Sequence, residues 1–192
     1  MGKPVVLDLE TKKSFREVER RKPEDLGVSV VGTYSYASDE FRAFREEQFD
    51  QLFRLLESAS LIIGFNITEF DLPVLRPYYV GDLMKIPRLD LLTTVHEEIG
   101  RRIALNEFAR ETLKTQKSGH GLQAINYYNE GKWDELIRYC LDDVRITRDL
   151  YEYGKEHGEI YYLAPWERRT VKVDWSTSNG TGGSDVNLTL GI

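Results

Sequence analysis

The sequence is poor in cysteine and has no long apolar run. Cys140 is the one cysteine among 192 residues, which excludes an intrachain disulfide and a zinc cluster built on cysteines. The N-terminus lacks the basic, apolar and small-residue order of a signal peptide, and no apolar stretch approaches the ~20 residues that span a bilayer. We therefore expect a soluble cytoplasmic protein, in a reducing compartment and without membrane contact.

Basic side chains are also fewer than acidic ones. The chain carries 26 Lys and Arg against 32 Asp and Glu, a formal net charge of −6. This balance excludes a generally basic surface that coats nucleic acid. It does not exclude a nucleic-acid enzyme, because a nuclease that holds divalent cations on carboxylates needs local acid and contacts phosphates through a few basic side chains.

Small polar residues are concentrated in residues 176–184. Such a segment cannot bury apolar surface, so we expect a flexible tail over residues 176–192. The hydrophobic content of 41% is sufficient for one sizeable core. The sequence thus predicts a single domain over residues 1–175.

The rest of the chain alternates between strand and helix patterns. Runs rich in β-branched, aliphatic or aromatic residues predict strands at 4–9, 27–36, 61–65 and 88–92, with 41–44 as a hairpin partner or a helix start. Apolar residues at helical spacing predict helices at 49–59, 69–79, within 94–116, at 121–129 and over 132–157. In residues 166–175 apolar and polar residues alternate in a way that predicts a strand or hairpin.

Two carboxylates stand at the end of the first predicted strand. Asp8 and Glu10 are two residues apart, so both side chains point to the same side of the sheet. Such a pair is costly unless a cation joins the two groups, and a metal ion would do so. The alternative is that Glu10 is a solvated strand end in an acid-rich chain.

A third acid, Asp71, follows the predicted strand at 61–65. Strand ends in α/β sheets are where functional sites are commonly built. The alternative is that Asp71 is an acid in the first turn of a helix, where it interacts favourably with the helix dipole, with Asn66 or Thr68 as the cap. The segment alone does not decide between these interpretations.

The long predicted helix carries a tyrosine and an acid on one face. Tyr139 and Asp143 are four residues apart and therefore adjacent in space. Asp142 points roughly 100° away, so we expect it to pair with Arg138 or Arg145 instead. The alternative for Tyr139 is a half-buried aromatic with its hydroxyl at the rim.

An acidic pair on a first strand, an acid after a middle strand, and an acid with a tyrosine on a late helix occur here in a fixed order. This pattern resembles the DEDD-type 3′-5′ exonucleases of the RNase H-like superfamily, in the branch that carries tyrosine. It is most similar to the proofreading domain of family-B DNA polymerases and to related stand-alone or helicase-attached domains. The matching segments are residues 7–11, 64–66 with 70–73, and 139–143.

The resemblance implies a fold and a set of roles. The fold would be α/β and RNase H-like, with a central mixed five-stranded sheet flanked by helices. The catalytic and metal-binding carboxylates would be Asp8, Glu10, Asp71 and Asp143, which hold two divalent ions, Mg²⁺ or Mn²⁺. Tyr139 would orient the attacking water. The substrate would be nucleic acid with a free 3′ end, with single-stranded DNA favoured over RNA.

Substrate contacts are expected beside the first two segments. A terminal nucleotide is held as a single strand by stacking and by backbone groups, and the candidates are Leu9, Thr11, Asn66 and Phe70. Phe65 is expected in the core instead.

A basic stretch that contains Lys114, Lys117 and His120 could contact the phosphate backbone or simply be solvated. Two other functions remain open at this stage. One is a catalytically silent nucleic-acid-binding domain, and the other is an RNase H-like endonuclease or other metal phosphohydrolase.

Overall fold

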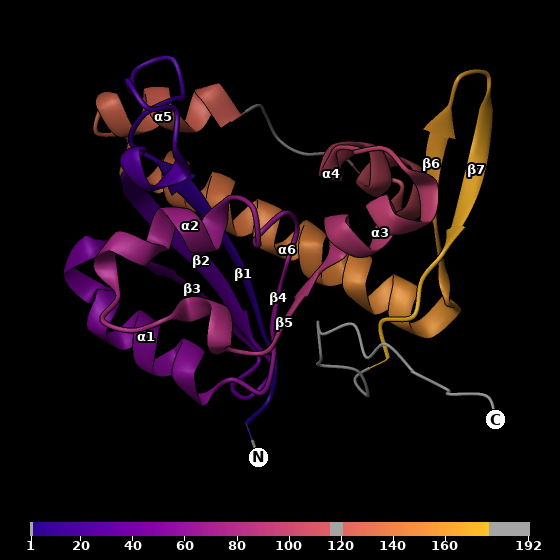
Figure 1. The fold of residues 1–192 in the computed structure, drawn as a ribbon, viewed down its shortest axis with the longest axis horizontal. Helices are drawn as coiled ribbons and strands as arrows, with labels where there is room; N and C mark the ends of the chain where they lie inside the picture. Colours follow the sequence, from indigo (N-terminus) through magenta and orange to yellow (C-terminus); the bar gives the residue numbers. More distant parts are fainter. Residues whose placement is uncertain (1, 116–120, 177–192) are drawn as a thin grey trace, which may run out of the picture.

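A computed structural model describes residues 2–115 and 121–176 of the chain (Figure 1). Five strands form a central sheet in the order β3-β2-β1-β4-β5, with antiparallel and parallel pairs. Their bounds are β1 Val5–Thr11, β2 Val28–Ser35, β3 Glu40–Phe44, β4 Ile62–Gly64 and β5 Arg88–Asp90. The mixed five-stranded sheet is thereby confirmed, as is the hairpin partner at 41–44.

Helices cover the sheet (Figure 1). The α-helices are α1 Phe49–Ser58, α2 Asp71–Leu75, α3 Leu91–Ile99, α4 Leu105–Phe108, α5 Gly121–Asn129 and α6 Trp133–His157. Short 3-10 turns lie at Pro23–Asp25, Glu46–Gln48, Arg76–Tyr78 and Leu83–Lys85, and a π-helical turn at Ala109–Leu113. Within these described ranges no helix is long and apolar enough to cross a membrane.

Side chains alternate across β1, and different helices cover its two faces. The odd-numbered residues from Val5 to Leu9 pack in one apolar cluster with side chains of α1 and α2. Val6 belongs to a second cluster with residues of α6. Because the side-chain period of a strand is two, Asp8 and Glu10 lie on the Val6 face. The two acids therefore face α6.

A glycine in β2 allows α6 to lie close to the sheet at this level. Gly32 is the β2 partner of Asp8. A Cβ atom added to Gly32 would lie 2.9 Å from both Cys140 Sγ and Val144 Cγ2, closer than real Cβ contacts allow. The absence of a side chain at Gly32 thus permits the approach that brings the middle of α6 over Asp8.

The start of α3 differs from the prediction. The sequence predicted a strand to residue 92, whereas β5 ends at Asp90 and the helix begins at the next residue. The Asp90 carboxylate accepts hydrogen bonds from the backbone N–H groups of Leu92 and Thr93. This is an N-cap, which satisfies helix donors that would otherwise lack an acceptor, and it ends the strand early.

A separate two-stranded hairpin follows α6. It consists of β6 Glu159–Ala164 and β7 Glu167–Lys172, paired antiparallel. The sequence predicted a strand or hairpin only within 166–175, so the prediction was wrong about where the hairpin starts. In β6 the inward residues Ile160, Tyr162 and Ala164 alternate with Tyr161 and Leu163, which are also apolar or aromatic. The period of two is therefore hidden in the sequence.

The last described residues return to the body of the domain. Trp175 is buried, and its Nε1 donates a hydrogen bond to Thr94 Oγ1 of α3 at 2.9 Å. Its ring lies over α6 at Gly154, where an added Cβ would lie 2.4 Å from the indole. The flexible tail predicted at 176–192 lies, apart from Ser176, outside the described residues.

Candidate active site

Three carboxylates from β1 and α6 meet at one point. Asp8, Glu10 and Asp143 each offer one oxygen, and these oxygens all lie within 4.8 Å of one another. Asp143 is 3% exposed and Glu10 is 9% exposed, while Asp8 is half-buried. Like charges this close, and this far from bulk water, repel strongly unless a cation or protons compensate them. The geometry therefore favours a cation-binding centre, which we call the carboxylate cluster.

Asp71 lies beside this cluster and is held by β1. The ladder between β1 and β4 covers Val5 and Val6, so the backbone N–H of Leu9 on the same edge is not taken up by β4. It donates instead to Asp71 Oδ1 at 3.0 Å, in a buried hydrogen bond. Asp71 is also the first residue of α2, as the alternative interpretation predicted, but the N-cap is Phe70, and neither Asn66 nor Thr68 caps the helix. Its carboxylate nevertheless faces the end of β1 rather than solvent.

Tyr139 is buried one turn of α6 before Asp143. Burial is the largest cause that raises the pKa of its hydroxyl, and the negative charges of Asp143, Glu10 and Asp8 raise it further. Both effects disfavour the phenolate. At neutral pH Tyr139 is thus a protonated group that can donate a hydrogen bond at the edge of the cluster.

Cys140, to which the sequence analysis gave no role at the site, lies next to Asp8. Its Sγ is 3.6 Å from the carbonyl oxygen of Asp8 and 3.9 Å from Asp8 Oδ2. Complete burial raises the pKa of the thiol, and the neighbouring acids add to this. A protonated thiol is a weak hydrogen-bond donor. The ligand atoms that the carboxylate cluster offers are the oxygens of Asp8, Glu10 and Asp143.

A cleft of about 290 Å³ opens over the cluster. It is lined by the five predicted catalytic residues and by all four predicted substrate-binding residues, Leu9, Thr11, Asn66 and Phe70. The structure thus brings all nine together. Phe65, which the sequence predicted in the core, also lines the cleft. Its ring packs edge-on against Phe108 of the core, with ring centroids 6.1 Å apart. Phe65 therefore contacts both the core and the cleft.

The loop after β1 supplies residues that sequence reasoning missed. Lys13, Ser14 and Phe15 line the cleft, as does Ile125 of α5. Phe15 is 39% exposed and packs edge-to-face on Phe70, with ring centroids 6.0 Å apart. The signal in the sequence was an aromatic residue within a basic run just after the acidic pair, and such a run has no periodicity that would fix its path.

Asp90 is a second residue that was missed. Besides capping α3, its carboxylate accepts from the backbone N–H groups of Asn66 and Thr68, each at 2.8 Å. Asn66 adopts a left-handed backbone with φ of 70°, which asparagine tolerates better than most residues. Asp90 therefore fixes the turn after β4 on which Asn66 and Asp71 depend.

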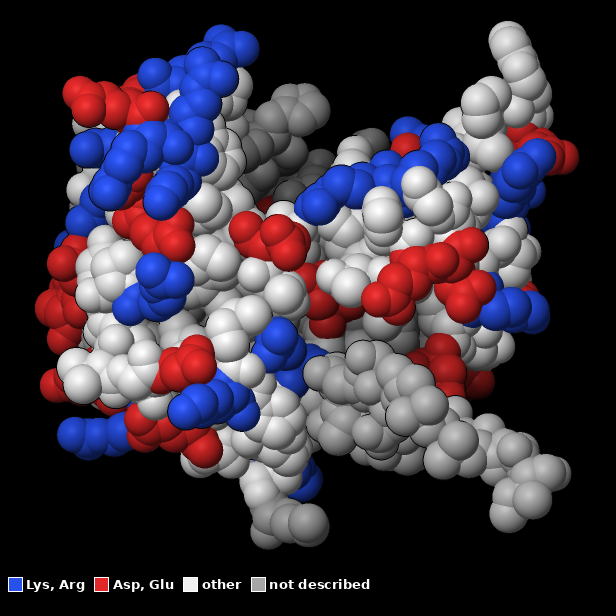
Figure 2. Space-filling view, viewed as in Figure 1, with Lys and Arg blue, Asp and Glu red and all other residues white. Residues whose placement is uncertain are grey.

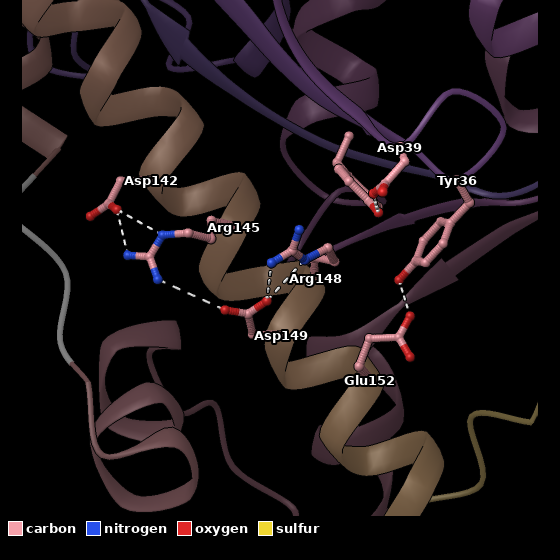
Figure 3. A network of polar contacts seen from close by, with 8 residues as sticks. Tyr36, Asp39, Asp142, Arg145, Arg148, Asp149 and Glu152 are labelled. Atoms are coloured by element: carbon pink, nitrogen blue, oxygen red, sulfur yellow. Dashed lines mark hydrogen bonds and ion pairs between the residues drawn. The ribbon is translucent and has the colours of Figure 1, made fainter.

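Asp142 points away from the cluster, as helix geometry predicted. It accepts two hydrogen bonds from the guanidinium of Arg145, at 3.2 and 2.6 Å, and both side chains are half-buried (Figure 3). Arg145 also approaches Asp149 at 3.8 Å. Asp142 thus belongs to a surface network of ion pairs.

The basic stretch after the π-helical turn contributes little that can be described. Lys114 is exposed, and its Nζ donates to the carbonyl oxygen of Glu111. Lys117 and His120 lie outside the described residues. Contact of this stretch with phosphate remains a prediction.

Comparisons with known proteins agree with this architecture. The family model of the RNase_H superfamily matches residues 7–154. No curated protein matches the chain by sequence. The structure of the family B DNA polymerase from the hyperthermophilic archaeon Pyrobaculum calidifontis is similar, with a TM-score of 0.58 and 19% identity. The likeness covers 79% of this chain and 24% of the polymerase chain, so this chain corresponds to about a quarter of that protein, and at this identity it shows a shared fold.

Proposed function

This chain belongs to the RNase H superfamily, and we propose that within it the chain is a metal-dependent 3′-5′ exonuclease of the DEDD type, in the branch that carries tyrosine. The observation that carries the proposal is the approach of the Asp8, Glu10 and Asp143 oxygens to within 4.8 Å. Asp71 and Tyr139 line the same cleft.

The chemistry of the donor set fits hard divalent cations. Carboxylate oxygens suit Mg²⁺ and Mn²⁺, and the three ligand atoms that lie within 4.8 Å of one another are all carboxylate oxygens. As the resemblance to DEDD exonucleases implies, Asp8, Glu10, Asp71 and Asp143 would together hold two such ions. When bound, such ions lower the pKa of a coordinated water and neutralise charge that develops on the phosphate.

The protein's own residues position the reactants. Tyr139 keeps its proton, so its hydroxyl can donate to or orient the attacking water but does not act as the base. Phe70, with Phe15 against its edge, presents an aromatic surface on which the base of a 3′-terminal nucleotide can stack. Leu9 and Thr11 line the same cleft. The substrate we propose is a single strand with a free 3′ end, DNA in preference to RNA.

The proposal is tested on 5′-labelled single- and double-stranded DNA and RNA with Mg²⁺ or Mn²⁺. We expect a ladder that shortens from the 3′ end, disappears on chelation and returns when metal is added back. Circular single-stranded DNA, which has no end, should remain intact. Cleavage of the circle would favour an endonuclease, and absence of metal-dependent cleavage from every substrate would favour a silent binding domain.

A substitution at Tyr139 separates the role of its hydroxyl from metal binding. Tyr139→Phe should slow cleavage by about a hundredfold to a thousandfold, the usual cost of removing one positioned hydrogen-bond donor, while the ring still fills its buried place. The rise in melting temperature on addition of Mn²⁺ should be the same as in the wild type. Tyr153→Phe, on the same helix but outside the cleft, is the matched control. Loss of the Mn²⁺-dependent rise would show that the hydroxyl has a different role.

A further inference from the structure

A second cleft adjoins the first and contains an arginine. It measures about 410 Å³ and shares Asp8, Phe65 and Asn66 with the cleft described above. Its remaining lining comes from Leu92 of α3 and from residues 102–105 just before and at the start of α4. In Figure 2, Lys and Arg side chains gather in two groups on this face, one over the loop between β1 and β2 and the other over the region of α4.

Arg102 is the one basic side chain among the described residues that line the second cleft. It is exposed, and its Nη2 donates a hydrogen bond to the side-chain oxygen of Asn66. Asn66 is in turn fixed through its backbone by Asp90. A guanidinium carries five N–H donors in a rigid plane, so donors remain for an anion after one is held by Asn66.

Its neighbour Arg101 has a different environment. The Arg101 guanidinium lies over the ring of Tyr162, 5.3 Å from the centroid, and donates to the carbonyl oxygen of Leu163 in β6. Two consecutive arginines thus serve different surfaces, and only Arg102 points into the groove that contains Asp8. The fixed orientation of Arg102 is what a phosphate-binding arginine requires.

The two clefts together define a path for a strand. Asp8 is common to both, so a phosphate bound at the carboxylate cluster lies where they meet. The aromatic cleft with Phe70 suits the terminal base, which leaves the second cleft for the next nucleotide. We propose that Arg102, oriented by Asn66, binds the phosphate on the 5′ side of the scissile bond. This inference rests on the proposed exonuclease function.

The path makes a prediction about substrate length. A trinucleotide with a 5′-hydroxyl has a second phosphate for Arg102, whereas a dinucleotide has only the scissile one. With the trinucleotide, Arg102→Ala should raise KM about tenfold to a hundredfold, the usual cost of losing a hydrogen bond to a charged group, with kcat nearly unchanged. With the dinucleotide, kcat/KM should match the wild type. Arg101→Ala should resemble the wild type on both substrates.

Chemical modification of the substrate isolates the contact. A methylphosphonate at the second linkage from the 3′ end removes the charge that Arg102 would bind. It should slow the wild type by the same factor as Arg102→Ala and slow that variant little further, because the two changes remove one interaction. Asn66→Gly keeps the left-handed backbone and removes only the amide, so it should show part of the same KM effect. Equal losses on dinucleotide and trinucleotide, or equal effects of Arg101→Ala and Arg102→Ala, would overturn the proposal.

A binding measurement distinguishes failure of this inference from failure of the function. Binding of a labelled single strand to a non-cleaving Asp143→Asn protein should weaken with salt, and Arg102→Ala should reduce the log–log slope by about 0.7, the value for one phosphate contact on a single strand. A wild type that cleaves while this slope and KM are unaffected by Arg102→Ala overturns the Arg102 assignment alone. A reduced slope in a protein that never cleaves supports Arg102 binding and overturns the exonuclease.

Discussion

Replacing Asp143 with asparagine is expected to reduce cleavage by about a thousandfold or more, which corresponds to about 4 kcal/mol of transition-state stabilisation. The same exchange at Asp142 should leave the rate within about twofold, because Asp142 lies outside the carboxylate cluster and its partly exposed ion pair with Arg145 contributes little to stability. The two residues are adjacent in sequence and the substitutions are isosteric. Only Asp143 belongs to the carboxylate cluster, whereas Asp142 accepts hydrogen bonds from Arg145.

Stability measurements show whether the loss arises from the site or from misfolding. Without metal, Asp143→Asn should raise the melting temperature, since it removes one of three mutually repelling charges; each kcal/mol relieved is worth about 2–4 °C. With saturating Mn²⁺ the order should reverse, because only the wild type gains the full linkage free energy, about 2.7 kcal/mol at a hundredfold excess over Kd. An Asp142→Asn protein that loses activity to the same extent would mean that the cluster has been misassigned.

Replacing Asp90 with alanine is expected to lower the free energy of unfolding by about 3–5 kcal/mol, which is a large part of the total free energy of unfolding of a typical domain. The Asp90 carboxylate accepts from four backbone N–H groups, and alanine leaves all of them without that acceptor. Urea denaturation followed by circular dichroism would report the change as a lower midpoint. At temperatures where the variant is still folded, cleavage should also fall, because the turn that holds Asn66 is released.

Asp82 provides the matched control for Asp90. It also caps a helical turn, but its carboxylate accepts from a single exposed N–H, that of Met84. Asp82→Ala should therefore cost about 1 kcal/mol or less, as for an ordinary cap. If the two substitutions destabilise the protein equally, Asp90 acts only as a helix cap, and its hydrogen bonds to the turn after β4 contribute nothing to stability.

The parts of the site that obey a period were predictable. A period of two placed Asp8 and Glu10 on one face of β1, and a spacing of four placed Tyr139 with Asp143 and turned Asp142 away. Neither rule states which helix covers which face of the sheet. That step came from the resemblance, because it depends on tertiary packing such as the close approach at Gly32.

The residues that were missed act over long separations in the chain. Asp90 had a local signal, an acid at a helix start, but its bonds to Asn66 and Thr68 cross more than twenty residues and have no pattern in the sequence. Cys140 contacts Asp8 from 132 residues away. β6 was missed because apolar and aromatic residues occupy both of its faces.

The alternation of side chains along β1 also determines which insertions and deletions of residues are compatible with an intact site. Deleting Leu7 alone would shift Asp8 and Glu10 together onto the opposite face, among the apolar side chains of α1 and α2. Two carboxylates would then be buried without partners, which no nearby substitution repairs. Length changes in the loop after β1 cost only a small loop-closure entropy. Among relatives of this protein, insertions and deletions should therefore accumulate in the part of that loop after Phe15, while the first strand keeps its length.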